Sequence, residues 1–229
     1  MEEYRYLHVP PDDFLKNGIL YRFLRDPDYA DQFVAGNIFI STLSECRGYE
    51  AAAGRGDPGE GTLRHRSGDL ILSGDNPEDL EIARRAGLVI IPGGGTLTLS
   101  GNVAEHKLED AYVLCTTERF SPDKLSDTFG KHCVRIDDAK TFFDRTSRAL
   151  VASLKSGRLD RAFMGCVSYT GRELQGRQQQ PAPIGFLKPP DLYADQQEVR
   201  MLWSMTPQVR LEPFLLKVPD VRGLCTRMT

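Results

Sequence analysis

The sequence has few of the residues that build common hydrolytic and metal-binding motifs. Its 229 residues include only four histidines, and no serine lies in a G-x-S-x-G elbow. The cysteines show no C-x-x-C spacing and the histidines no H-x-x-x-H spacing. These absences disfavour a serine or cysteine hydrolase and a structural zinc site, and no metal ligands are assigned.

Long apolar runs and a secretory signal are also missing. The chain begins Met1-Glu2-Glu3-Tyr4-Arg5, which is polar and acidic. No apolar run approaches the ~18 residues of a membrane span. The five cysteines are widely spaced and odd in number, which is typical of reduced thiols rather than a disulfide framework. We therefore expect a cytoplasmic protein with no membrane segment.

The charge balance argues against a broadly basic surface. The net charge is −3 and the pI is near 5.9, whereas non-specific nucleic-acid binders are usually basic. The 29 Lys and Arg residues still leave room for a local basic groove. Hydrophobic content of 40% and charged content of 27% are typical of a globular protein, and the length suits one domain over residues 1–229.

Hydrophobic periodicity predicts a strand-rich α+β domain with short helices. Period-two alternation and apolar runs mark the strands, while capping residues and glycine stops mark the helices. The expected helices are 12–18, 27–36, 77–86 and 139–154. The expected strands are 4–9, 19–23, 37–43, 69–72, 88–91, 96–100, 111–117, 129–136, 162–169, 193–203 and 214–219.

A charged, glycine-rich loop is expected at about residues 44–68. A loop of this length is uncommon in a compact domain and is usually functional or mobile, although a solvated surface loop explains it equally well. Its arginines are candidates for docking the phosphates of a nucleic acid: Arg47, Arg55, Arg64 and Arg66. Its carboxylates leave a metal-dependent nuclease as an alternative: Glu45, Glu50, Asp57 and Glu60.

The segment Tyr193–Trp203 places charges in a strand that otherwise looks buried. In a period-two pattern, Glu198 and Arg200 share one face, while Val199 and Met201 occupy the other. Charges on a buried strand are costly unless each finds a partner. The pair is therefore either a structural ion pair or part of a polar cleft.

Polar residues also stand on two earlier expected strands, and the set resembles a known pattern. Tyr21 and Arg22 lie on the first strand, Ser41-Thr42 ends the next, and Gln196-x-Glu198 lies late in the chain. An Arg, a Ser-Thr and a Q-x-E in this order resemble the ADP-ribosyltransferases. The resemblance implies a split β-sandwich with short flanking helices, which clamps NAD as its substrate.

The resemblance also implies a role for each residue. Arg22, beside Tyr21, would hold the phosphates of NAD, and Ser41 and Thr42 would brace the site. Glu198 would be the catalytic carboxylate, and Gln196 would position the acceptor. A fixed carboxylate suits this chemistry because positive charge develops on the ribose as the glycosidic bond breaks. The acceptor would be nucleic acid or protein, as in a toxin or phage-defence effector with an antitoxin or other operon partner.

A second resemblance covers more of the chain. A Phe-Ile-Ser-Thr-Leu strand, Val-Leu-Cys-Thr-Thr, Phe-Gly-x-His-Cys-Val-Arg-Ile and a late Gln-Glu-Val-Arg are similar to a bacterial family known only as a domain of unknown function. That family usually has E-x-E-x-R in the last block, where this chain has Gln196 for the first Glu. It supports the fold more than an activity. A non-enzymatic binding or sensor module of a defence system therefore stays open.

Overall fold

A computed structural model describes residues 18–48, 56–91, 93–154, 158–206 and 210–228 of the chain. It divides into two compact units. Unit 1 comprises residues 1–60, 109–167 and 191–229, and unit 2 comprises residues 61–108 and 168–190. No helix within the described ranges is long and apolar enough to span a membrane.

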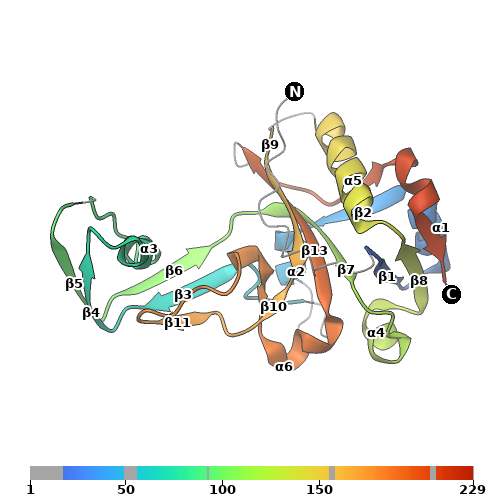
Figure 1. Cartoon of the computed structure of the whole chain (residues 1–229). Coiled ribbons are helices and arrows are strands. Elements are labelled where there is room, and N and C mark those ends of the chain that lie inside the picture. The colour runs from blue at the N-terminus through green and yellow to red at the C-terminus, as the bar shows by residue number, and fades with distance from the viewer. Residues whose placement is uncertain (1–17, 49–55, 92, 155–157, 207–209, 229) are drawn as a thin grey trace. The chain divides into compact units, whose positions relative to one another are not determined.

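Unit 1 is built on a large antiparallel sheet (Figure 1). One path through this sheet runs β14-β2-β7-β1-β8-β15, while β13 pairs with β7 and β9. The strands of the described part of unit 1 are β1 (Leu20–Leu24), β2 (Asn37–Thr42), β7 (Ala111–Thr117), β8 (His132–Ile136), β9 (Arg158–Cys166), β13 (Glu198–Thr206), β14 (Phe214–Lys217) and β15 (Cys225–Arg227).

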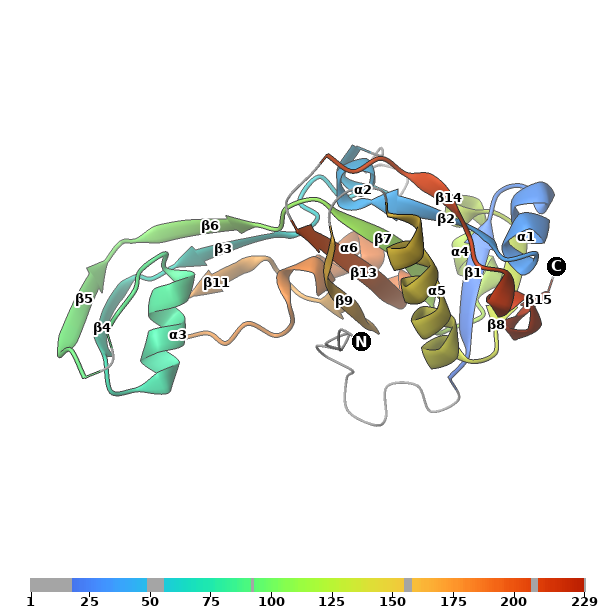
Figure 2. The same ribbon diagram turned by 90° about the horizontal axis from the view of Figure 1, so that it is seen from above.

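Helices α1 and α5 cover one face of this sheet and enclose the main core. Helix α5 packs on β9 and β14, as Figure 2 shows from above. Trp203 of β13 is fully buried there, stacks on Phe143 and donates a hydrogen bond from its indole nitrogen to the Ser147 hydroxyl at 2.8 Å. The helices are α1 (Pro27–Val34), α2 (Leu43–Gly48), α4 (Pro122–Phe129), α5 (Ala139–Ser153) and α6 (Pro190–Tyr193), with 3-10 turns η3 (Ala194–Gln196) and η4 (Pro219–Leu224).

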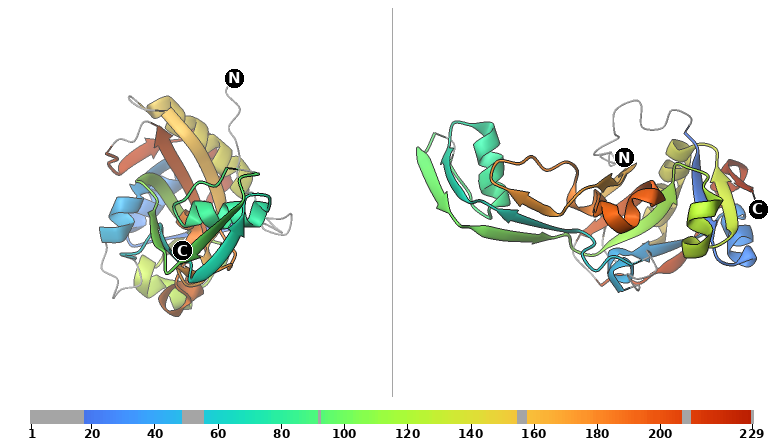
Figure 3. Two further views of the ribbon diagram at one scale, coloured as in Figure 1. Left: turned by 90° about the vertical axis from the view of Figure 1, so that its left-hand side faces the viewer. Right: turned by 90° about the horizontal axis from the view of Figure 1, so that it is seen from below.

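Unit 2 is a smaller set of hairpins with one helix, α3, which packs against β4 (Figure 3). Strands β3 and β6 pair antiparallel and β11 joins β3 in parallel, while β4 and β5 form a further antiparallel pair. The elements are β3 (Thr62–Arg66), β4 (Asp69–Ser73), α3 (Pro77–Arg85), β5 (Thr96–Ser100), β6 (Val103–Lys107), β10 (Ser168–Tyr169), β11 (Glu173–Gln175), η2 (Ile184–Phe186) and β12 (Leu187–Lys188).

The α+β class and the strand-rich character are confirmed, and the single domain expected over residues 1–229 stays a prediction. Several expectations about local structure need correction. The expected loop at 44–68 contains most of α2 and all of β3, because Leu63 and His65 are buried between outward-facing charges. Residues 88–91 form no strand. The strand at 4–9 and all but the last residue of the helix at 12–18 lie outside the described residues.

Helix α5 begins where the sequence predicts, because Asp138 caps it. The Asp138 carboxylate accepts hydrogen bonds from the Thr141 amide at 2.9 Å and the Thr141 hydroxyl at 2.6 Å. Hydrogen bonds from the Thr141 side chain and backbone lower the pKa of Asp138. A carboxyl whose pKa is lowered by folding stabilises the fold above its unfolded pKa and loses that effect as pH falls through the folded value.

We therefore predict that Asp138→Ala lowers the free energy of unfolding by about 1 kcal/mol at neutral pH. The difference from wild type should shrink as the pH falls below the ordinary value of 3.8, because protonation weakens the cap in the wild type. Urea denaturation at several pH values measures this. Asp127→Ala, at an exposed position in the last turn of α4, serves as the control and should show no such loss.

Candidate functional site

Strand β7 joins the three strands that carry the predicted site residues. Along one edge it pairs with β13 from Ala111 to Thr117. Along the other edge it pairs with β2 at Tyr112 and Val113 and with β1 only at Thr117. Residues 114–116 therefore separate β1 from β2 on this edge, and we call this place the β7 fork.

The register assigns each side chain to a face of the sheet, because directly opposed residues of antiparallel strands point to the same side. Glu198 lies opposite Thr117, Arg200 opposite Cys115, and Ser41 opposite Val113. Since residues 113, 115 and 117 alternate along β7, these side chains share one face, which we call the polar face. Val199 and Met201 point to the other face, into the main core, as the sequence predicts.

Three charged side chains meet on the polar face as a buried cluster, the Arg200 cluster. The Arg200 guanidinium donates to Glu198 from Nε at 2.8 Å, and to both carboxylate oxygens of Glu60 at 2.6 and 3.1 Å. Arg200 and Glu60 are each 1% exposed and Glu198 is 3% exposed. The bidentate bond to Glu60 satisfies the guanidinium geometrically as well as electrostatically.

Burial and the two carboxylates act in opposite directions on the charge of Arg200. Burial alone would lower the pKa of Arg200, because a charge is poorly solvated inside a protein. Glu198 and Glu60 outweigh that effect and raise its pKa well above the ordinary value. Arg200 therefore stays charged, and the cluster is an ion pair rather than a set of neutral groups.

Backbone hydrogen bonds hold the segment 56–60 over β13. Arg47 of α2 donates from Nε to the Glu60 carbonyl at 2.8 Å, and the Asp57 amide donates to the Cys46 carbonyl at 3.1 Å. The Tyr193 hydroxyl donates to the Gly56 carbonyl at 2.7 Å. Helix α2 and the residues before β13 thus fix Glu60 from both sides.

Gln196 does not share the strand face expected for it. It ends the turn η3, and Gln197 follows in a left-handed conformation with φ of 41°. Strand β13 begins only at Glu198. The expectation of one strand over residues 193–203, which would place Gln196 on the face of Glu198, is therefore wrong for residues 193–197. Gln196 is nevertheless buried.

The predicted NAD-binding residues lie around the β7 fork, but not on a single face. Arg22 alternates with Tyr21 along β1, so it starts on the core face beside Leu20, opposite to the polar face. Its Nη1 donates to the Cys115 carbonyl at the open edge of the fork. The Thr42 hydroxyl accepts a hydrogen bond from the Glu45 amide at 3.2 Å and so caps α2.

Two of these residues have buried polar atoms with no hydrogen-bond partner among the described residues. They are the Arg22 Nε and the Ser41 hydroxyl. Buried polar atoms are satisfied in the great majority of cases, so unsatisfied ones call for a physical explanation. Tyr21, by contrast, packs its ring on Phe120 with centroids 5.5 Å apart.

The predicted phosphate-docking arginines are not one group. Arg47 belongs to α2 in unit 1, while Arg64 lies on β3 in unit 2 and forms an ion pair with Glu105 at 3.4 Å. Arg55 lies outside the described residues. Among the residues that the structure describes, no three His, Cys, Asp or Glu side chains are placed to hold a metal ion. Glu60, one of the expected nuclease ligands, instead binds Arg200.

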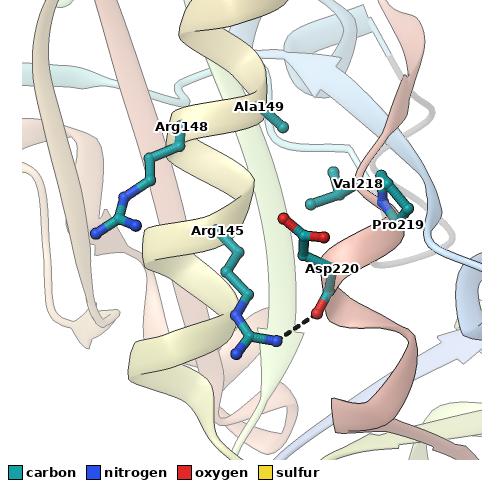
Figure 4. Close-up of a pocket in the computed structure, with 6 residues that line it drawn as sticks. All are labelled: Arg145, Arg148, Ala149, Val218, Pro219 and Asp220. Carbon is teal, nitrogen blue, oxygen red and sulfur yellow. Dashed lines mark hydrogen bonds between the residues drawn. The ribbon is translucent and has the colours of Figure 1, made fainter.

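A separate cavity of about 360 Å³ lies between α5 and η4 (Figure 4). Arg145 and Arg148 line it from α5, and Arg145 donates to the Asp220 carbonyl. Val218 and Pro219 form an apolar side. None of the residues predicted from the sequence lines this cavity.

Sequence reasoning missed Glu60 as the partner of Arg200. One feature of the sequence indicates that Arg200 needs a second partner. A guanidinium has five donors, and the single carboxylate of Glu198 cannot satisfy all of them on a buried strand. No protein-family model, no curated protein and no solved structure matches this chain. The interpretation of the site therefore depends on its geometry.

The Arg200 cluster should be a main determinant of stability. Arg200→Met removes the guanidinium shared by two buried carboxylates, and we expect the free energy of unfolding to fall by about 3–5 kcal/mol. Chemical denaturation followed by circular dichroism measures the loss.

The matched control for this substitution is Arg210→Met. Arg210 also pairs with a glutamate two residues away, Glu212, at 3.1 Å, but the side chains are 90% and 72% exposed. Solvent-exposed pairs contribute little, so stability should hardly change. Equal losses in the two variants would contradict the importance of burial.

Proposed function

We propose that this protein is an NAD-dependent ADP-ribosyltransferase-like enzyme whose substrate binds at the β7 fork. Glu198 is the carboxylate that acts on the nicotinamide ribose, and Arg22 and Ser41 contact other parts of NAD. The acceptor is nucleic acid or protein.

One observation carries the proposal. The three strands expected from the resemblance all pair with β7, and two of them separate along one edge to form the fork. The resemblance implies a split β-sandwich, and a sheet whose strands separate at this edge is compatible with it. The unsatisfied Arg22 Nε and Ser41 hydroxyl add support, because a bound ligand with phosphate or hydroxyl groups would supply their missing hydrogen bonds.

The chemistry requires a carboxylate that stays ionised beside a developing positive charge. The glycosidic bond of NAD breaks, nicotinamide leaves with the bonding electrons, and the acceptor forms the new bond to the ribose and releases a proton. Glu198 would stabilise the positive charge on the ribose in a site from which water is largely excluded. Arg200 donates to Glu198 and so orients the carboxylate.

The same geometry sets a condition on the proposal. Glu198 is 3% exposed, so the groups that cover it have to move before the ribose can reach it. This burial favours a second candidate function, a non-enzymatic binding or sensor module in which Glu198 is only a structural partner of Arg200.

Glu198→Gln distinguishes the two candidates, since it keeps the size of the side chain and removes its charge. For an enzyme, we expect release of nicotinamide from NAD to fall by about 100-fold or more, the usual effect of losing one charge-stabilising group. The assay uses water, single-stranded DNA, RNA and protein as acceptors, and Glu212→Gln, an exposed carboxylate, as the control.

Stability provides the second measurement on the same variants. If wild type releases no nicotinamide with any of these acceptors while Glu198→Gln lowers the melting temperature, the enzyme is excluded and Glu198 is structural. If the activity of Glu198→Gln equals that of wild type, its catalytic role is wrong.

A further inference from the structure

Two cysteines meet beside the Arg200 cluster, although they lie far apart in the sequence. Cys46 is on α2 and Cys115 is on β7, directly opposite Arg200 in the pairing of β7 with β13. Helix α2 packs against β7, and the Cys46 and Cys115 side chains lie within hydrogen-bond contact of each other. Both residues are free cysteines that keep some exposure to solvent.

The surroundings give the two sulfurs different reactivities. The hydrogen bond with Cys115 lowers the pKa of Cys46 and outweighs burial, which raises it. The Arg200 cation also lowers this pKa, whereas Glu60 and Glu198 raise it. The same hydrogen bond and burial raise the pKa of Cys115. Because the thiolate is the reactive form, Cys46 is the better nucleophile and Cys115 holds its proton.

The remaining cysteines lack this arrangement. Burial is the main cause that raises the pKa of Cys133, Cys166 and Cys225 to about 12 in each case. Their thiolates are scarce at neutral pH, so oxidants and alkylating reagents should react with them slowly. The chain therefore has one thiol suited to oxidation. A second thiol lies in hydrogen-bond contact with it and can react with the oxidised sulfur to form a disulfide.

We propose that Cys46 and Cys115 form an oxidant-sensitive dithiol that closes to a disulfide on reaction with a peroxide. The Cys46 thiolate attacks one peroxide oxygen, the O–O bond breaks, and the sulfur becomes a sulfenic acid while hydroxide leaves and takes up a proton. The Cys115 thiol then attacks that sulfur, the S–O bond breaks, and water leaves with the Cys115 proton. The two thiols lose two electrons and the peroxide gains them.

Closing this disulfide would tie α2 to β7 next to the Arg200 cluster. Helix α2 also holds the segment that carries Glu60, because Arg47 donates to the Glu60 carbonyl and the Cys46 carbonyl accepts from Asp57. The oxidised protein would therefore hold residues 57–60 more firmly over Glu198. This consequence is independent of whether the protein acts on NAD.

The test treats the full-length protein with hydrogen peroxide, blocks the remaining thiols by alkylation and maps the peptides by mass spectrometry. We expect a peptide pair linked through Cys46 and Cys115, lighter by two hydrogens and separated by a reducing agent. Cys46→Ser and Cys115→Ser should each abolish the link. Cys166→Ser is the matched control, since Cys166 is also partly exposed, and should leave it unchanged.

A second probe works on the wild-type protein and covers the case in which a variant fails to fold. A trivalent arsenical binds two adjacent thiols, so phenylarsine oxide should protect Cys46 and Cys115 together from alkylation while the slow alkylation of Cys166 is unchanged. If peroxide converts Cys46 to a sulfinic acid while Cys115 remains a free thiol, or if the linked peptides contain other cysteines, the proposal is wrong. The proposal is also wrong if peroxide consumes the free Cys46 thiol completely and no disulfide-linked peptide is found.

Discussion

The buried pairing of Arg200 with Glu60 and Glu198 is the interaction on which the rest of unit 1 depends. An uncompensated guanidinium at this depth would be strongly destabilising, so the two carboxylates have to be brought to it. Glu198 comes from the same strand, whereas Glu60 comes from a segment 140 residues earlier in the chain. The need to neutralise the buried charge of Arg200 therefore holds three parts of the chain together: helix α2, the segment 56–60 and the start of β13.

The cluster also explains why β13 is buried on both faces. Val199 and Met201 supply an apolar face that packs into the main core, and Trp203 fixes it through Phe143 and Ser147. Arg200 supplies a polar face whose groups satisfy one another. A strand of this kind separates two environments, a dry hydrophobic core and a buried network of charges, thiols and hydroxyls. Any chemistry that involves Glu198 takes place in the second environment.

The thiols and the fork occupy neighbouring positions along β7. Cys115 faces Arg200 with its side chain, while its carbonyl accepts a hydrogen bond from Arg22 at the open edge of the fork. One residue of the central strand thus contacts the predicted nucleotide-binding arginine and stands beside the charge cluster. Oxidation of its sulfur would therefore change the surroundings of Arg200 on the polar face.

Much of the local structure follows from short-range patterns. The helices at α1, α3 and α5 have their capping residues in the sequence, and β5 and β7 span the predicted residues, because capping and period-two alternation are local properties. Five of the described strands lie outside the expected ranges, namely β3, β6, β11, β12 and β15. In β3 and β6, charged positions hide the alternation. No local pattern indicates the division into two units either, since unit 2 is assembled from two separated stretches and has no linker of distinctive composition.

The sequence by itself determined that β13 carries an acid and a base on one face and apolar residues on the other, because side chains alternate along any strand. It also determined that those charges need partners, because buried charges are costly. Only the tertiary structure decided which partners they have. The packing of α2 and β7 brings Glu60, Cys46 and Cys115 to Arg200. Arg22 faces away from Glu198 because β1 pairs Tyr21, and not Arg22, with Thr117. Contacts of this kind depend on strand pairing between distant segments, which no local pattern encodes.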